Sequence, residues 1–228
     1  MSKNVLIDLL PEKTQERLFA RAQLTELSLS QIICHVDEPA VFIYFPVNGF
    51  ISLVQRIDER PPLEVGMIGR EGVLGSESLL GASRNSFGAI VQGNGSAWRI
   101  KVQDFLVEVK NCPEFRRVVD SYIAVRIGQL GLAAACEHFH EIGPRLAKWL
   151  LMSQDRAQSP TFLMTHEFIS LMLGVRRVGV TTAAADFKRR GLIGYHRGEM
   201  KILNRSALKA GACTCYQKNR KIYSALIN

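Results

Sequence analysis

The sequence predicts an α+β protein in three parts: a jelly-roll-like β-roll, a long helix, and a helical C-terminal module with a small β-hairpin. Three observations carry this prediction. β-forming segments alternate with glycine turns over residues 28–103, a heptad stripe begins at Phe115, and two amphipathic segments flank a turn at Gly174. The 228 residues, 47% hydrophobic and 22% charged, suit one or two folded domains and exclude a mostly disordered chain.

The first segment, residues 5–27, has apolar residues at helical spacing, and Pro11 suits the first turn of a helix. The pattern then changes to short runs of β-forming residues bounded by turn signals such as Asn48–Gly49. We expect strands at residues 41–46, 50–56, 63–68, 89–92 and 96–100, with Gly93–Asn94–Gly95 as a hairpin turn between the last two. Such strands are typical of a double-stranded β-helix, so residues 28–103 are expected to be all-β.

After Pro113 the sequence becomes helical, with apolar or uncharged residues at alternating intervals of three and four. This is the a/d pattern of a helix that packs along a partner helix. A lone helix that joins two small domains has little core of its own to lie on, so we expect homodimerisation through this face. The alternative is that the stripe packs against the helix's own domain. The predicted dimer residues are Phe115, Val118, Tyr122, Val125, Gln129, Leu132 and Cys136, and the pattern continues to Phe139.

The positive charge of the chain lies at its C-terminal end. The formal net charge is +8 and the pI about 9.4, yet residues 1–110 carry a net −2, whereas the residues from Ile142 onward include 15 basic and 4 acidic ones. Gly143–Pro144 breaks the helical pattern at the same point. We therefore divide the chain into domains 1–112, 113–141 and 142–228. The last is expected to bind an anion, nucleic acid above all, because each neutralised phosphate releases counterions.

Residues 165–203 carry the most specific pattern. Thr165 is a good N-cap for a helix over residues 166–173, Gly174 begins a three-residue turn, and a second, basic helix is expected over residues 177–190. A small hairpin over residues 195–203 follows. Helix, tight glycine turn, helix and hairpin together make a winged helix-turn-helix, which places its second helix in the major groove of DNA.

Most residues expected at the DNA lie on this second helix and on the hairpin, which forms the wing; Thr165 precedes the first helix and Arg176 lies in the turn. Near the start of the helix, Arg177 can make two hydrogen bonds to guanine, and a threonine can bind phosphate or touch a thymine methyl group. The basic residues further along are better placed for phosphates. The predicted contacts are Thr165, Arg176, Arg177, Val178, Gly179, Thr181, Thr182, Lys188, Arg189, Arg197 and Lys201.

Over nearly its whole length the chain resembles the Crp/Fnr superfamily of bacterial transcription regulators. The resemblance rests on the heptad helix, on the winged helix and on three β-roll motifs, Leu9–Leu10–Pro11, Tyr44–Phe45–Pro46 with Gly49, and residues 64–75. It implies a cyclic-nucleotide-binding-like sensor β-roll and a homodimer that reads a two-fold-symmetric operator in double-stranded DNA. It also implies a contact with RNA polymerase.

The expected effector pocket departs from the family pattern. In members that bind cyclic nucleotides, a Gly-Glu pair holds the ribose and an Arg-Ser pair holds the cyclic phosphate. The matching positions here are Gly75–Ser76 and Ser86–Phe87, with Arg84 two residues away, so the carboxylate and the bidentate phosphate partner are missing. We expect a regulator that does not depend on a cyclic nucleotide, and the alternative is one that responds to a cyclic nucleotide or another small molecule. Val178 stands where the family has a glutamate that accepts from cytosine, so a different operator is expected.

No catalytic residue, metal site or cofactor is predicted. The five cysteines fit no disulfide framework, and Cys213-x-Cys215 lacks a second pair at zinc-ribbon spacing. The cluster of Cys136, His138, His140 and Glu141 is not expected to bind a metal, because positions i and i+2 of a helix do not share a face. A small β-barrel metalloenzyme, the alternative of a different class, needs several histidines on its strands, and the β region has only His35.

The sequence also carries an expectation about the compartment. The N-terminus lacks the apolar core and cleavage site of a signal peptide. No uninterrupted apolar run approaches the roughly 18 residues that a membrane-spanning helix needs. We therefore expect a cytoplasmic protein that does not bind a membrane.

Overall fold

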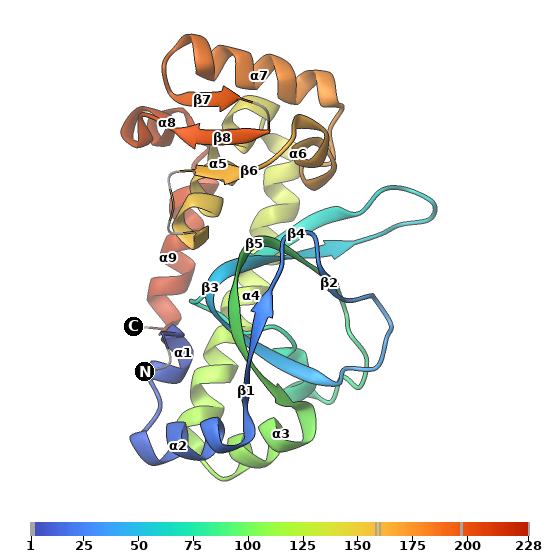
Figure 1. Cartoon of the computed structure of the whole chain (residues 1–228), viewed down its shortest axis with the longest axis vertical. Helices are drawn as coiled ribbons and strands as arrows, with labels where there is room; N and C mark the ends of the chain where they lie inside the picture. Colours follow the sequence, from blue (N-terminus) through green and yellow to red (C-terminus); the bar gives the residue numbers. More distant parts are fainter. Residues whose placement is uncertain (1–2, 158, 160, 197, 228) are drawn as a thin grey trace. The chain divides into compact units, whose positions relative to one another are not determined.

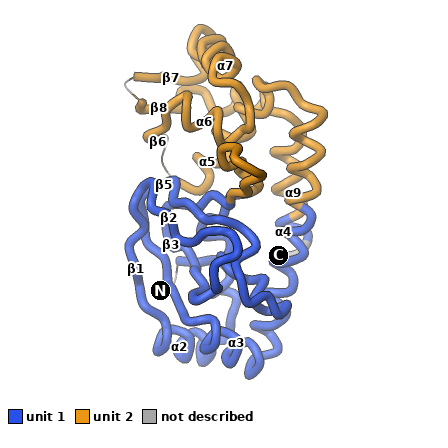
Figure 2. The backbone as a smooth tube through the Cα atoms, turned by 90° about the vertical axis from the view of Figure 1, so that its right-hand side faces the viewer, with its two compact units in different colours: residues 1–53, 67–128, 223–228 blue, residues 54–66, 129–222 orange. Residues whose placement is uncertain are grey.

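The computed structural model describes residues 3–157, 159, 161–196 and 198–227. The chain divides into two compact units (Figure 2): residues 1–53, 67–128 and 223–228 form unit 1, and residues 54–66 and 129–222 form unit 2. Antiparallel sheets and helices occur together, which confirms the predicted α+β class (Figure 1). The finer division of the chain at residues 112/113 and 141/142 stays a prediction.

The N-terminal half contains the β-roll and the helices that flank it (Figure 1). Its sheet has the strand order β1-β5-β3-β4, and β2 pairs with β5 off this path. The elements are α1 (Val5–Asp8), α2 (Glu12–Arg21), β1 (Gln23–Leu27), β2 (Ile32–Cys34), β3 (Phe42–Gln55), β4 (Leu63–Ile68), the 3-10 helix η1 (Ser76–Leu80), β5 (Gly88–Lys101), α3 (Val102–Lys110) and α4 (Pro113–Phe139).

The strands β3 and β5 are each continuous over 14 residues, so the predicted turns at Asn48–Gly49 and Gly93–Asn94–Gly95 are wrong. The glycines instead allow a close approach of the two strands, since a Cβ on Gly95 would lie 2.2 Å from the carbonyl oxygen of Asn48. The side chain of Asn48 accepts hydrogen bonds from the backbone N–H and the hydroxyl of Ser96, at 2.7 and 3.0 Å. β5 pairs with β2 before this point and with β1 from Gly95 onward.

The N-terminal segment is helical only as far as Arg21, because residues 23–27 form β1 and pair with β5. Buried Asn4 fixes the start of this segment. Its side-chain oxygen accepts from the N–H groups of Leu6 and Ile7, and its amide donates to the carbonyl oxygens of Pro46 and Gly72 at 2.9 and 3.0 Å. The sequence also does not predict α3, which follows β5 directly.

Helix α4 covers the predicted long helix, but much of its heptad stripe is buried in the chain itself. Phe115, Val118, Tyr122, Val125 and Cys136 are buried, Gln129 and Leu132 are half-buried, and Phe139 is exposed. The ring of Phe115 lies edge-on to Phe105 with centroids 5.6 Å apart. A Cβ on Gly72 would lie 2.2 Å from the Tyr122 hydroxyl oxygen, so position 72 must be glycine for Tyr122 to pack there. For these residues the structure shows packing within the chain, which is the alternative that the sequence left open.

A different face of α4 is exposed. Ile127 is 65% exposed, Ala124 and Ala134 are exposed, and a Cβ added to Gly131 would meet nothing within 4 Å. Within the described residues α4 is long and apolar enough, by length and composition, to cross a membrane, although no uninterrupted apolar run suggests it. The pair α6 and α7 passes this test only if counted as one span, and the two helices are bent by 115°. The core helix of a globular protein meets the same criterion. The finding therefore shows that α4 is an apolar helix and nothing more.

The C-terminal half contains α5 (Ile142–Ala157), β6 (Thr161–Leu163), α6 (His166–Met172), α7 (Arg177–Arg189), β7 (Ile193–His196), β8 (Glu199–Ile202), α8 (Arg205–Gly211) and α9 (Cys215–Ile227). The three strands form an antiparallel sheet in the order β6-β8-β7. Arg205 ties α8 to α5 and α9, donating to Asp155 at 2.5 Å and to the Tyr216 hydroxyl at 2.8 Å. The strand β6 and the helices α8 and α9 are not predicted by the sequence.

Candidate nucleic-acid interface

The two helices α6 and α7 and the turn between them lie where the sequence predicts. The Thr165 hydroxyl caps α6 by accepting from the N–H of Phe168 at 3.1 Å. Gly174 has a φ of +61°, a conformation that favours glycine, and a Cβ there would also lie 2.7 Å from Leu63 Cδ1. Helical periodicity turns an apolar face of each helix inward, and the buried residues include Ile169, Met172, Val180, Ala184 and Phe187.

The opposite face of α7 is exposed and carries most of the predicted DNA contacts. Arg176, Arg177, Val178, Thr181 and Thr182 are all exposed. The Arg177 guanidinium Nε lies 3.7 Å from a Glu167 carboxylate oxygen, with side chains 68% and 60% exposed. Such an exposed ion pair is weak, so Arg177 can exchange it for another acceptor. The helix therefore presents one arginine fork, two hydroxyls and the apolar Val178 within its first turns.

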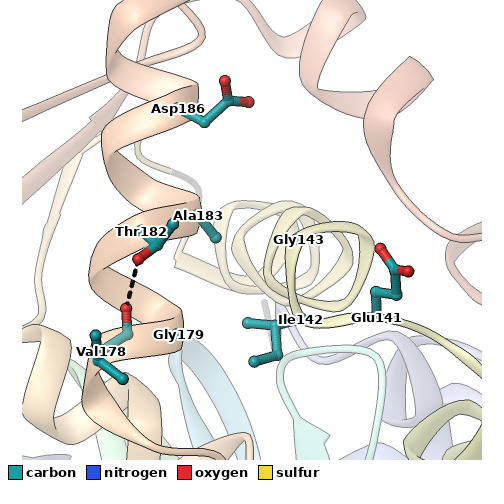
Figure 3. Close-up of a pocket in the computed structure, with 8 residues that line it drawn as sticks. All are labelled: Glu141, Ile142, Gly143, Val178, Gly179, Thr182, Ala183 and Asp186. Atoms are coloured by element: carbon teal, nitrogen blue, oxygen red, sulfur yellow. Dashed lines mark hydrogen bonds between the residues drawn. The ribbon is translucent and has the colours of Figure 1, made fainter.

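Gly179, a further predicted DNA contact, has a packing role in the structure. A Cβ at Gly179 would lie 2.6 Å from Ile142 Cδ1, so the glycine lets α7 approach the start of α5 closely. An open groove of about 550 Å³ adjoins this contact. Residues of α7, the start of α5 and Glu141 line it (Figure 3). The Thr182 hydroxyl donates to the carbonyl oxygen of Val178 at 2.9 Å beside this groove (Figure 3).

His166 joins α6, α7 and the wing, and sequence reasoning does not identify it. Its ring stacks on Tyr195 of β7 with centroids 4.4 Å apart and planes at 19°, and its Nδ1 lies 3.2 Å from the Thr181 hydroxyl oxygen. Burial, followed by the positive charge of Arg177, lowers the pKa of His166. The sequence signal that identifies His166 is its position directly after the N-cap Thr165, at the start of the first helix of the motif. His166 thus links both helices to the wing.

The C-terminal end of α7 and the wing supply exposed basic residues. Lys188 and Arg189 are exposed on α7, and Lys201 is exposed on β8, opposite Gly194 of β7. Asp186 accepts from Arg189 at 2.5 Å and from Arg190 at 3.2 Å, and these hydrogen bonds lower the pKa of its carboxyl. Asp186 therefore offsets part of the positive charge here. Arg197, predicted as a wing contact, lies outside the described residues.

A buried arginine connects the end of α4 with the first helix of the motif. Arg145 of α5 is 5% exposed, and its guanidinium contacts the Glu137 carboxylate and donates to the carbonyl oxygen of Leu173 at 2.6 Å. Leu173 is the C-cap of α6. The charge-assisted bonds thus fix the end of α6 to the junction of α4 and α5. Sequence reasoning counts Arg145 only as part of an amphipathic helix.

The residues predicted for an effector pocket lie in or beside the β-roll, and they differ in exposure. Gly75 has a φ of +89° at the start of η1, and Ser76 is buried. Ser86 is exposed, and the carbonyl oxygen of half-buried Phe87 accepts from the Cys34 thiol at 3.7 Å. Arg84, the residue that could replace the missing phosphate partner, is exposed. Its guanidinium already donates a hydrogen bond to the carbonyl oxygen of Asp37.

Comparison with known proteins finds similarity to the family that the sequence resembles. Residues 144–210 match the Crp-like helix-turn-helix domain. The chain is 22% identical over 195 residues to the global nitrogen regulator of Synechococcus elongatus, covering 82% of this chain and 88% of that protein.

Solved structures agree on the fold. A Eubacterium rectale protein described as a transcriptional regulator of the Crp/Fnr family has a TM-score of 0.70 at 16% identity, covering 90% of this chain and 96% of that one. FixK2 of Bradyrhizobium japonicum has a TM-score of 0.69 at 16% identity, covering 85% and 98%. The predicted fold and the predicted resemblance to the Crp/Fnr regulators are confirmed.

Proposed function

We propose that the chain is a cytoplasmic, sequence-specific transcription regulator of the Crp/Fnr type that binds a palindromic operator as a homodimer. The exposed first turns of α7 are the observation that carries this proposal. They offer Arg177, Thr181 and Thr182 on a helix whose other face is buried, and a helix of this kind fits the major groove, about 12 Å wide. Lys188, Arg189 and Lys201 supply cations for the flanking phosphates.

Selection of binding sites from random duplexes tests the proposal directly. The full-length protein should enrich a two-fold-symmetric sequence whose half-sites are about 10–10.5 base pairs apart, centre to centre, or a multiple of that spacing. Binding to the enriched site should be at least about 1,000-fold tighter than to a scrambled duplex at the same salt concentration. Equal affinity for both duplexes would exclude sequence-specific recognition.

The homodimer in this proposal uses the exposed face of α4. Ala124, Ile127, Gly131 and Ala134 recur at intervals of three, four and three, which is the a/d spacing of a two-helix contact. Gly131 and the alanines allow two helices to approach closely, and Ile127 supplies the bulky contact. This register replaces the predicted stripe from Phe115 to Cys136, because most of that stripe is occupied inside its own chain.

Replacing Ile127 with Asp tests this face. The charge would have to lose water to enter the dimer contact, so sedimentation velocity should show a monomer for Ile127→Asp at concentrations where the unchanged protein is a dimer. Ile57→Asp is the matched control, since Ile57 is 68% exposed and Ile127 65%. If both variants remain dimeric, the dimer does not use this face of α4.

The proposed regulator does not depend on a cyclic nucleotide. Ser76 stands where the family has its ribose carboxylate, and Ser86 stands where it has its phosphate-binding arginine. Arg84, two residues away, is engaged with Asp37. Calorimetry with cyclic AMP and cyclic GMP should give no saturable heat. Saturable binding of either nucleotide would favour the alternative of a small-molecule-responsive regulator.

The proposal includes contact with RNA polymerase and assigns no enzymatic activity. Both follow from the resemblance to transcription regulators. The metalloenzyme alternative needs several histidines on the strands, and the β region has only the exposed His35. Transcription in vitro from a promoter that carries the selected operator should change on addition of the protein. Transcription that stays the same while the operator is occupied would exclude the polymerase contact at that promoter.

A further inference from the structure

We propose that Cys136, His140, Cys213 and Cys215 form a binding site for a single zinc ion in unit 2. Their four potential ligand atoms all lie within 4.8 Å of one another. The three cysteines are buried and His140 is half-buried. Three thiolates and one imidazole are a common ligand set of structural zinc sites, which are closed to other ligands.

The spacing of the ligand atoms fits a tetrahedral ion. Zinc–sulfur bonds of about 2.3 Å and zinc–nitrogen bonds of about 2.0–2.1 Å, at tetrahedral angles, place two sulfurs about 3.8 Å apart and a sulfur and a nitrogen about 3.6 Å apart. In the structure the Sγ atoms of Cys136 and Cys213 are 3.7 Å apart, and Cys215 Sγ lies 3.7 Å from His140 Nδ1. Two edges of the tetrahedron are therefore already near their final length.

The ligands come from two parts of the chain that fold together. Cys136 and His140 are four residues apart at the C-terminal end of α4, so they share one face of the helix. Cys213 and Cys215 lie at the junction of α8 and α9, and the N–H of Cys213 donates to the carbonyl oxygen of Pro144 at 3.2 Å. Sequence reasoning considers each pair by itself and therefore misses the set of four.

Lys148 supplies the group that balances the charge of such a site. Its ammonium Nζ lies 3.2 Å from Cys136 Sγ. Three thiolates and a neutral histidine around Zn²⁺ leave a net charge of −1, and the ammonium cancels it while it holds the sulfur in place. This follows the general rule that groups behind the ligands orient them.

A disulfide is the competing use of these thiols. It would join two of the three sulfurs, most directly Cys136 and Cys213, and would leave Cys215 and His140 without a shared role. A closed site with four protein ligands instead uses every member of the cluster and joins the end of α4 to the start of α9. We therefore assign the site a structural role.

Metal analysis of the full-length protein, purified under reducing conditions without chelators, tests the assignment. Inductively coupled plasma mass spectrometry should find about one zinc per chain, and replacement of zinc by cobalt should give the visible absorption of tetrahedral cobalt–thiolate coordination. Cys213→Ser and His140→Ala should each lower the zinc content or affinity at least about ten-fold. Cys34→Ser, which changes a cysteine of unit 1, is the matched control and should keep full zinc content.

Lys148→Gln keeps all four ligands. It therefore tests the site without the risk that loss of a ligand unfolds the protein. It should still bind zinc, with an affinity about 10- to 100-fold lower. The proposal is overturned if protein expressed with ample zinc contains none and the reduced apoprotein gives no cobalt spectrum. It is equally overturned if Cys213→Ser and His140→Ala retain zinc like Cys34→Ser, if another metal occupies the site stoichiometrically, or if mass spectrometry finds a Cys136–Cys213 disulfide in place of the metal.

Discussion

Replacing Arg177 with Ala should reduce the preference of the protein for the proposed operator and leave its folding nearly unchanged. The only ion pair of Arg177 within the described residues is the 3.7 Å contact with Glu167, and both side chains are more than half exposed. An exposed pair of this kind contributes less than about 1 kcal/mol to stability. A bidentate contact with guanine, in contrast, discriminates against the wrong base by about 1–3 kcal/mol, or about 5- to 150-fold in Kd.

Fluorescence anisotropy with the selected operator and with a scrambled duplex, over a range of salt concentrations, measures this effect. Arg177→Ala should weaken binding to the operator by that factor and change binding to the scrambled duplex much less. Lys201→Ala is the matched control, because this exposed wing residue is expected to bind a phosphate. It should weaken binding to both duplexes alike and reduce the slope of log K against log salt by about 0.9 for each phosphate that the variant no longer neutralises.

The outcome that contradicts this reasoning is equal weakening on both duplexes by Arg177→Ala. Arg177 would then contact the backbone, and the bases would be read by other residues of α7, with Val178 and Thr181 the next to test. A loss of thermal stability large enough to explain the weaker binding would also refute the reasoning, because the ion pair with Glu167 would then be stronger than its exposure allows.

Three further predictions concern the framework of the site. Thr165→Ala removes the N-cap of α6 and should lower the free energy of unfolding by about 1 kcal/mol in urea titrations, whereas an unchanged value would show that the cap is dispensable. Gly131→Leu should weaken the proposed dimer in sedimentation experiments; a variant that stays dimeric and gains up to about 1 kcal/mol from helix propensity would contradict a close α4 contact. Because the folded state lowers the pKa of His166, the unfolded chain takes up more protons as the pH falls below about 6.5, so stability should decrease there. His166→Gln should flatten this dependence, and a profile identical to that of the unchanged protein would exclude His166 as its source.

Local signals explain why the DNA-binding motif could be predicted so closely from the sequence. Thr165 caps α6, Gly174 takes the positive φ of the turn, and the basic residues continue to the end of α7. Each of these features depends on residues within a few positions of one another, and the structure agrees with each to within one or two residues. The third strand, β6, is different, because its pairing with β8 joins residues about 40 positions apart.

Glycine-rich segments in the β-roll show where local reasoning fails. Gly93–Asn94–Gly95 has the composition of a hairpin turn, yet it lies inside the continuous strand β5. The glycines are needed because the backbone of Asn48 on β3 lies too close for any Cβ at Gly95. Composition alone does not distinguish a chain reversal from a close approach of two strands, since both need a residue without a side chain.

The heptad stripe of α4 illustrates a more general limit. A periodic apolar pattern predicts that one face of a helix is buried, but it does not identify what covers that face. Phe115 and Tyr122 lie against residues of their own unit, whereas Ile127 and Gly131 leave a second face open at nearly the same spacing. The two faces interleave along one helix, so the sequence supports a dimer contact and a core contact equally well.

The end of α4 is where the proposed zinc site and the DNA-binding motif meet. Cys136 is a proposed zinc ligand, and the next residue, Glu137, contacts Arg145, which binds the last turn of α6 through the carbonyl oxygen of Leu173. Fixing the helix end through Cys136 would therefore also restrict the position of Glu137, one residue away. We expect removal of the metal to loosen the hydrogen bond between Arg145 and Leu173, even though no proposed ligand lies on α6 or α7. Hydrogen exchange of the α6 amides with and without metal measures this coupling, and identical protection in both states would show that the two features are independent.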